Sequence, residues 1–355
     1  MIGITQTDSS TSPCSRLANV DGEGYVGHAV PEWTLGDHLG AVGVRLGIRR
    51  KRYIVTPGLY TFGSPGADSP VFVSANYKLS FDRLRRSLAG TNAWIVVLDT
   101  KGINVWCAAG KGTFGTDELV RKIRECRLHD CVTHRRLILP QLGAPGVAAH
   151  EIKRQTGFAV VYGPVYAEDI AAYVRAGFQA TPDMRRVRFR WFERLTVAWL
   201  ELVIHFRKML LCGLAFAALA GVSAEGPFWS TAWNRGARVF LLWVLSYGLA
   251  GILGPLLLPC LPTRAFSIKG ACLGAGLAAL GVWVAGTDWS VLQSTGWILL
   301  VTAGASHMLL NFTGATTFTS PSGVRREVRL ALPAQIAVGA IGLVAWTVGG
   351  FLATW

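Results

Sequence analysis

The chain has 355 residues and a formal net charge of +14. Many of its cations flank apolar runs, where they suit anionic lipid headgroups, so the charge gives little reason to expect a nucleic-acid partner. Its seven cysteines are an odd number and do not indicate the disulfide framework of a small secreted domain.

The first 32 residues are polar, rich in Ser, Thr and Gly, and show no periodic pattern. Such a segment buries too little apolar surface to fold, so residues 1–32 are predicted to be a polar disordered tail. It lacks a basic patch followed by an apolar core, and we therefore expect no cleavable signal peptide.

Residues 33–183 are predicted to be an α/β domain. Short apolar, β-branched runs predict buried strands at Tyr53–Val55, Pro70–Val73, Ala93–Leu98, Leu137–Leu139 and Phe158–Tyr162. Helical patterns lie between them, at Ser80–Leu88, Thr116–Leu128, Val147–Thr156 and Ala167–Ala176. This alternation predicts a largely parallel, doubly wound sheet, which binds its ligands beyond the carboxyl ends of the strands.

Residues 184–208 mix Arg with Trp, Phe and Leu, which predicts a basic amphipathic connector on the bilayer surface. Residues 209–355 are predicted to form a transmembrane domain of about five helices. The candidate spans are Met209–Val222, Val239–Leu258, Ile268–Ala285, Gly296–Phe312 and Leu332–Leu352. The first is the weakest because it is short.

The cations around these spans predict their orientation. Most lie on one side of the predicted spans, including Arg207, Lys208 and Arg325, whereas Arg235 and Arg238 lie on the other. The positive-inside rule then predicts a multi-pass protein of the cytoplasmic (inner) membrane with its α/β domain in the cytoplasm. The spacing of Gly270 and Gly274 also predicts close helix packing.

One motif lies at the expected ligand-binding edge, directly after the strand that ends near Asp99. It reads Asn104-Val105-Trp106-Cys107-Ala108-Ala109-Gly110-Lys111, and a helix is expected from Thr116, whose hydroxyl would cap it. A phosphate-binding loop is excluded, because that pattern needs Gly at Val105 and Ser or Thr at Gly112. What remains is a cysteine flanked by an aromatic ring and small residues, which let a large flat ligand approach the backbone.

This motif resembles the signature of the mercury-methylating corrinoid proteins, the HgcA family. The likeness continues through Val71–Asp82, His134–Val147 and the hydrophobic C-terminal half, so it covers nearly the whole chain after the tail. It implies a Rossmann-like corrinoid-binding domain in which a cap helix after the motif covers the cofactor. That domain is related to the corrinoid-binding domain of corrinoid iron-sulfur proteins.

The resemblance also implies roles for individual residues. Cys107 would be the catalytic residue and the lower axial ligand to cobalt, and Ser74 would replace a more usual Thr near the corrin. The implied cofactor-binding set is Ser74, Asn104, Val105, Trp106, Cys107, Ala108, Ala109, Gly110 and Lys111. A thiolate opposite the methyl group donates electrons to cobalt and favours transfer to the soft ion Hg(II).

The implied activity is a cobalamin-dependent methyltransferase that produces methylmercury. By the same resemblance, a methyltetrahydrofolate-type donor supplies the methyl group, and a ferredoxin-like 4Fe-4S protein of the HgcB type donates electrons. Two alternatives stay open. The chain could be a membrane-bound corrinoid methyl carrier of acetyl-CoA metabolism, whose corrinoid has no cysteine ligand, or a transporter with a regulatory domain.

Overall fold

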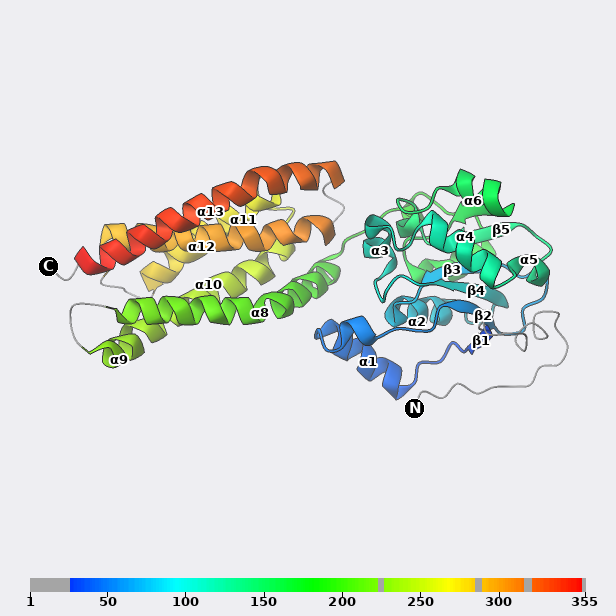
Figure 1. The fold of residues 1–355 in the computed structure, drawn as a ribbon, viewed down its shortest axis with the longest axis horizontal. Coiled ribbons are helices and arrows are strands. Elements are labelled where there is room, and N and C mark those ends of the chain that lie inside the picture. Colours follow the sequence, from blue (N-terminus) through cyan, green and yellow to red (C-terminus); the bar gives the residue numbers. More distant parts are fainter. Residues whose placement is uncertain (1–25, 223–226, 285–288, 316–320, 353–355) are drawn as a thin grey trace. The chain divides into compact units, whose positions relative to one another are not determined.

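The computed structural model describes residues 26–222, 227–284, 289–315 and 321–352. Contacts divide the chain into two compact units, Met1–Val187 and Arg188–Trp355, called here the α/β unit and the helical unit. Figure 1 labels most of the helices and strands of both. The predicted connector, residues 184–208, is therefore shared between the units, while residues 1–25 of the predicted tail lie outside the described residues.

The α/β unit alternates strands with helices, as the sequence pattern predicts. Its strands are β1 Val26–Ala29, β2 Gly58–Phe62, β3 Val71–Ala75, β4 Ala93–Leu98, β5 Arg136–Leu139 and β6 Ala159–Tyr162. Its α-helices are α1 Leu35–Arg45, α2 Lys78–Ser87, α3 Val105–Lys111, α4 Thr116–Glu125, α5 Leu128–Cys131, α6 Ala149–Thr156 and α7 Ile170–Arg175. Short 3-10 turns are η2 Arg50–Arg52, η3 Gln141–Gly143, η4 Ala167–Asp169 and η5 Asp183–Arg185.

The six strands form one mixed sheet in the order β1-β2-β4-β3-β5-β6. Strands β4, β3, β5 and β6 run parallel, which confirms the α/β class. The sheet is less parallel than predicted, because β2 pairs antiparallel with β4, and β1 follows β2 in parallel. The doubly wound part is therefore the half of the sheet that carries the motif.

Helices cover both faces of the sheet. Alternate residues of β3 separate the two cores: Val71, Val73 and Ala75 pack with α3, α4 and α6, whereas Phe72 packs with α2 and α7. Strand β4 divides in the same way and is buried along its whole length. Burial on both faces explains why these strands read as continuous apolar runs rather than alternating ones.

Two predictions for the N-terminal part are wrong. Tyr53–Val55 is not a strand, since it contributes only an isolated bridge between Ile54 and Tyr77. Conversely, Val26–Ala29 lies in the predicted tail but forms strand β1, because its backbone pairs with β2. The sequence pattern did not predict strand β2 either. In both cases the pairing partner is distant in sequence.

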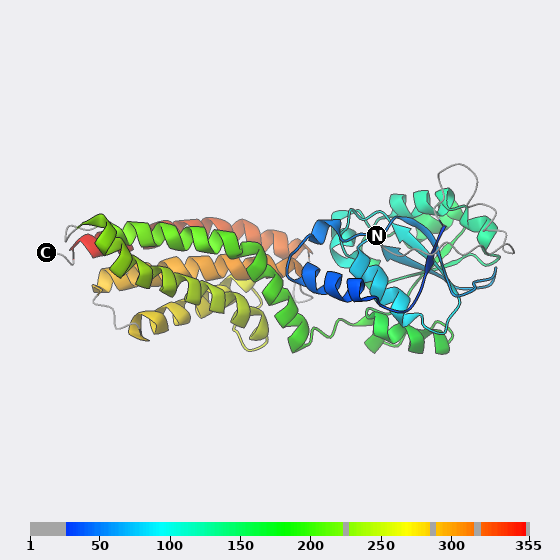
Figure 2. The same cartoon turned by 90° about the horizontal axis from the view of Figure 1, so that it is seen from below.

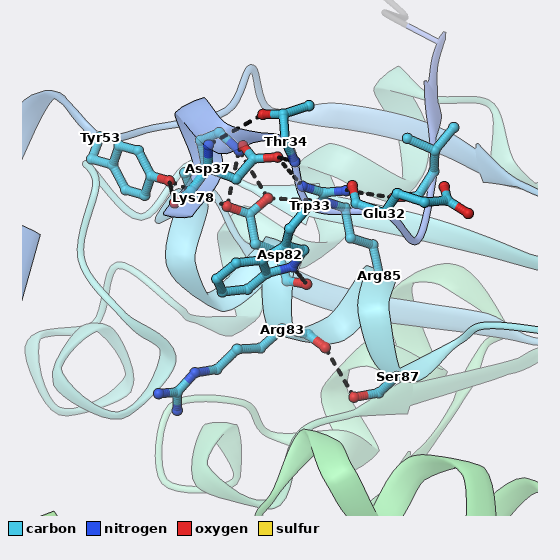
Figure 3. Close-up of polar contacts among 11 residues, drawn as sticks. Glu32, Trp33, Thr34, Asp37, Tyr53, Lys78, Asp82, Arg83, Arg85 and Ser87 are labelled. Carbon is cyan, nitrogen blue, oxygen red and sulfur yellow. Dashed lines mark hydrogen bonds and ion pairs between the residues drawn. The ribbon is translucent and has the colours of Figure 1, made fainter. Parts of the chain in front are cut away.

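A network of buried charges holds α1 against α2 (Figure 3). The Asp37 carboxylate on α1 accepts from Lys78 and, at 2.7 Å, from Arg85, while Asp82 accepts from Lys78 at 2.9 Å and from Arg85 at 2.8 Å. The Tyr53 hydroxyl donates to the Asp37 carbonyl oxygen at 3.2 Å. The Asp82 side chain is fully buried, and both carboxylates meet both cations, so the charges are paired.

This network predicts a loss of stability in acid. Burial by itself would raise the pKa of Asp37, but hydrogen bonds from Lys78 and the Thr34 amide, with the charges of Lys78 and Arg85, hold it well below its ordinary value of 3.8. A depressed folded-state pKa stabilises the fold above the unfolded value, and that contribution is lost as pH falls below about 4 toward the folded pKa. Asp37→Asn is expected to lower stability by about 3 kcal/mol at pH 7.

Calorimetry of the detergent-solubilised chain between pH 7 and pH 3 measures this effect. The Asp37→Asn variant should show a smaller loss of melting temperature across this range than the native chain. Asp183→Asn, at an exposed carboxylate on the same unit, is the control and should change neither value. Equal acid sensitivity of Asp37→Asn and the native chain would contradict the prediction.

In its described residues, the helical unit contains five long helices and three short segments. These are α8 Trp191–Gly221, α9 Phe228–Thr231, the π-helix η6 Ala232–Gly236, α10 Ala237–Leu256, α11 Phe266–Val284, α12 Val291–Asn311, η7 Phe312–Ala315 and α13 Pro321–Leu352. Figure 2 shows the long helices of this unit side by side. Helix α8 runs unbroken for 31 residues, so it includes both most of the predicted connector and the first predicted span.

Four segments among the described residues are long and apolar enough to cross a membrane: Trp191–Gly221, Phe228–Leu256, Phe266–Val284 and Ser322–Leu352. The fourth predicted span, Gly296–Phe312, corresponds to α12, which is not in this set. Its polar side chains are used inside the unit: Ser306 donates to the Ser267 carbonyl oxygen at 2.8 Å and accepts from Gln335 at 2.9 Å. A helix packed within the unit needs less apolar surface than one facing lipid.

The predicted packing of Gly270 and Gly274 is confirmed. A Cβ added at Gly270 would lie 2.7 Å from the Ser306 Cα, and one at Gly274 would lie 2.6 Å from the Ala305 Cβ. These contacts bring the backbones of α11 and α12 together, as small residues do between membrane helices.

Candidate functional site

The motif forms a helix of its own, α3, rather than a loop before a cap helix. The Asn104 side chain caps its first turn by accepting from the Cys107 amide at 2.9 Å. Gly112 ends it in the left-handed region, at φ 80°, which suits glycine. These two caps fit a seven-residue helix between them, and a separate helix, α4, begins at Thr116.

Helix α3 presents two different faces. Val105, Ala108 and Ala109 are buried against the sheet, whereas Cys107, Gly110 and Lys111 are exposed. A Cβ added at Gly110 would meet nothing within 4 Å. The thiol therefore opens onto free space beside a side-chain-free backbone, which leaves room for a large planar group. Trp106 and Asn104 are half-buried at its start.

Asn76 organises the loop that leads from β4 into α3. Its side-chain oxygen accepts from the Thr100 amide at 3.1 Å, the Thr100 hydroxyl at 2.8 Å and the Gly102 amide at 3.0 Å. Its amide group donates to the Asp99 carboxylate at 3.2 Å. The Thr100 hydroxyl also lies 2.7 Å from the Ile103 carbonyl oxygen, directly before the cap of α3, so the two acceptors share its single proton. Our prediction from sequence missed this role, although Asn76 follows a buried strand at the ligand-binding edge.

The loop after β5 packs against the buried side of α3 and the segment that follows it. A Cβ on Gly146 would overlap the Phe114 carbonyl oxygen and lie 2.9 Å from the Ala109 Cα, so the two backbones touch. A Cβ on Gly143 would lie 2.6 Å from the Phe114 ring. Small residues of the motif thus have two roles. Ala109 allows close packing on the buried side of α3, and Gly110 leaves space for a ligand on the exposed side.

Thr116 begins α4 as predicted, but its hydroxyl has another role. The N-cap of α4 is Gly115, which has no side chain to cap the helix, and the Thr116 hydroxyl instead accepts from the Ala148 amide at 2.9 Å. That bond joins the start of α4 to the start of α6. The predicted capping contact is therefore wrong, because a distant backbone group uses the oxygen.

Ser74 lies apart from the motif. It is buried on β3 in register with Val97, on the sheet face that carries α2, whereas the inner residues of α3 pack on the other face. Its hydroxyl donates to the Ala75 carbonyl oxygen at 3.4 Å. The structure therefore brings Asn104–Lys111 together as one helix but does not bring Ser74 to it.

The surroundings of Tyr77 show which charges lie near Cys107. Burial raises the pKa of the Tyr77 hydroxyl, the charges of Arg50, Arg45 and Arg83 oppose that rise, and the Cys107 thiolate adds to it. One hydroxyl thus lies within electrostatic range of the thiol and of three guanidinium groups. An anionic ligand beside the Tyr77 hydroxyl is electrostatically favoured.

The other two cysteines in the described part of this unit are poor competitors for a soft metal. Cys126 and Cys131 are both buried, and burial raises the pKa of the Cys126 thiol to about 11, which keeps it protonated and unreactive. Within the described ranges no three His, Cys, Asp or Glu side chains gather as metal ligands. Cys107 is thus the accessible thiol of the described α/β unit.

The part of this chain that is similar to known proteins lies in the α/β unit. Residues 49–174 match the family model of the CO dehydrogenase/acetyl-CoA synthase delta subunit. The chain is 34% identical over 113 residues to the acetyl-CoA decarbonylase/synthase complex subunit gamma of Archaeoglobus fulgidus, covering 31% of this chain and 24% of that protein. The corresponding subunit of Methanocaldococcus jannaschii is 31% identical over 128 residues, covering 36% and 26%.

The corrinoid/iron-sulfur protein large subunit of Moorella thermoacetica is 28% identical over 120 residues, covering 33% of this chain and 25% of that protein. The chain thus aligns with about a quarter of the length of these curated relatives. The family-model match includes β2 to β6 and α3, and it ends before the helical unit. The α/β unit is therefore related to a region of these subunits.

Proposed function

We propose that the α/β unit binds a corrinoid and takes part in methyl transfer, with the Cys107 thiolate as the lower axial ligand to cobalt. One observation carries this proposal: the Cys107 thiol is exposed on a capped helix directly after β4. Ligands of doubly wound sheets bind at this edge. Support also comes from the relationship to a protein named for its corrinoid.

A bound corrinoid supplies a cobalt centre that accepts and releases a methyl group. The chain's own residues would hold and orient that group. Asn104 fixes the first turn of α3 through the Cys107 amide, so the thiol is positioned before any ligand arrives. Coordination deprotonates the thiol, and Trp106 would limit access of water to the sulfur. Gly110 leaves the backbone open, and Lys111 would meet an anionic part of the cofactor.

The proposed methyl acceptor has two candidates. The names of the matched relatives support carriage of methyl groups in acetyl-CoA metabolism, and none of these names mentions mercury. Transfer to Hg(II) is the second candidate, favoured by the exposed Cys107 thiol and by the resemblance of Asn104–Lys111 to the mercury-methylating signature. Cys107 would hold the cobalt through an electron-donating sulfur, and a bound corrinoid would supply methyl transfer to a soft metal ion.

The proposed partners follow from the same chemistry. A methyltetrahydrofolate-type donor would supply the methyl group, and a ferredoxin-like 4Fe-4S protein of the HgcB type would supply electrons. The helical unit would anchor the protein in the inner membrane, with the α/β unit on the cytoplasmic side, where these soluble partners are found. Four helices of suitable length and hydropathy support the membrane location.

The full chain, purified in detergent from a corrinoid-producing host, provides the test. We expect about one cobalt per chain, because each α/β unit has one proposed corrinoid site and the corrinoid carries the cobalt. With labelled methyltetrahydrofolate and a reductant, the label should appear either in methylmercury after addition of Hg(II) or in acetyl-CoA after addition of an acetyl-CoA synthase. The first result selects mercury methylation and the second selects methyl carriage. A chain without bound cobalt would overturn both.

A further inference from the structure

Helix α1 is attached to the α/β unit by the side that carries Asp37. Asp37, Ala41 and Val44 face inward and are buried, and the ion pairs of Asp37 with Lys78 and Arg85 hold this side (Figure 3). A soluble domain normally buries the large apolar side chains of such a helix and exposes the charged ones. In α1 the buried side carries the carboxylate, whereas three leucines and a valine lie on the outer side.

The outer side of α1 is a continuous apolar stripe. Leu35, Leu39, Val42 and Leu46 follow at intervals of four, three and four residues, so they lie on one face. Their exposed fractions are 74%, 63%, 53% and 40%. These four residues are called here the α1 stripe. A contiguous exposed apolar surface of this kind marks an interaction site.

The segment after the stripe is strongly basic. Arg45 lies in the last turn of α1, and Arg49, Arg50, Lys51 and Arg52 follow it. From Trp33 to Ala67 the sequence contains one acidic residue, Asp37, and that residue is paired on the inner side. The exposed surface here combines an apolar stripe with cations and carries no compensating anion from its own segment.

We propose that the α1 stripe and the basic turn at Arg49–Arg52 lie on the anionic surface of the lipid bilayer. An interfacial helix has this composition, with apolar side chains at the acyl boundary and cations at the headgroups. The helical unit supplies the second argument: four segments suited to crossing a membrane keep a bilayer within reach of this domain. A second copy of the chain fits less well, because it would bring the same cations face to face.

Photo-crosslinking in nanodiscs tests the proposal on the full chain. Benzoylphenylalanine replaces Leu39 in the stripe or Lys153, an exposed helical position on α6, as the matched control. In nanodiscs with a phosphatidylglycerol fraction, position 39 should crosslink to phospholipid and position 153 should not. Crosslinks from position 39 to residues 188–355 of the same chain, or to a second chain, would overturn the proposal and identify what covers the stripe.

The basic turn provides a second, independent readout. Arg49→Gln with Arg52→Gln removes two cations, and Lys153→Gln with Arg175→Gln removes two from exposed positions elsewhere on the unit. Each cation near an anionic surface contributes roughly a fivefold factor, so the first pair should reduce lipid crosslinking at position 39 severalfold while the second leaves it unchanged. Equal crosslinking in all variants, or in purely zwitterionic lipid, would contradict the electrostatic part.

Discussion

Replacing Cys107 by alanine is expected to abolish methyl transfer while leaving the fold intact. The thiol is exposed, and the capping bond of α3 uses the Cys107 backbone amide, which alanine retains. The variant should lose the visible-spectrum signature of sulfur bound to cobalt. Its transfer rate should fall by more than about 100-fold, since even outer-shell partners of metal ligands contribute about 10- to 100-fold.

Two further variants define the role of the sulfur. Cys272→Ala removes an exposed thiol from the helical unit and should leave spectrum and rate unchanged. Cys107→His keeps a ligand but loses the anionic charge, so the corrinoid should be retained while transfer is impaired. If Cys107→His is fully active, thiolate donation is not required. If Cys107→Ala keeps the native spectrum, Cys107 is not a cobalt ligand.

Replacing Asn76 by alanine is expected to disorder the approach to α3 and to destabilise the α/β unit. Asn76 is buried, and its loss leaves the Gly102 amide without its acceptor and removes one of the two acceptors of the Thr100 amide. A buried donor left unpaired costs about 1–3 kcal/mol and a further lost hydrogen bond about 1 kcal/mol, so a total of roughly 2–4 kcal/mol is expected. Hydrogen exchange of the full chain should show the change at residues 99–107, with a lower melting temperature of the unit.

Asn92→Ala is the matched control. Asn92 is exposed at the opposite end of β4 and accepts one hydrogen bond from the Ser64 amide, at 3.0 Å. Its replacement should cost less than about 1 kcal/mol, as for a hydrogen bond whose groups water can reach. Equal effects of the two substitutions would show that Asn76 does not organise the loop. Unchanged exchange at residues 99–107 would show the same.

The candidate site was largely predictable because its signals are local. The strand Ala93–Leu98 is confirmed without change of boundaries, and the motif follows it at the carboxyl edge of the sheet. The helical form of the motif was missed, although both of its caps stand in the sequence. Asn104 at the start of the motif and Gly112 after it are ordinary cap residues, but the seven residues between them show too little periodicity to distinguish a helix from a loop.

Other features were unpredictable because they depend on residues far away in the chain. Ser74 has the right side chain for a hydrogen bond, yet its place on β3 directs it to the face opposite α3. Asn76 gave no local signal of its function, because its partners Asp99 to Gly102 are more than 20 residues away. The Thr116 hydroxyl likewise accepts a hydrogen bond from the distant Ala148 amide.

The sequence alone determined the alternation of strands and helices, the place of Cys107 after β4, and an apolar C-terminal half, since hydrophobic periodicity records burial residue by residue. Only the tertiary structure decided the direction of β2, the pairing of β1, and the attachment of α1 through Asp37, Lys78, Asp82 and Arg85. Those features require partners separated by tens of residues, and local pattern carries no information about which distant group will meet them.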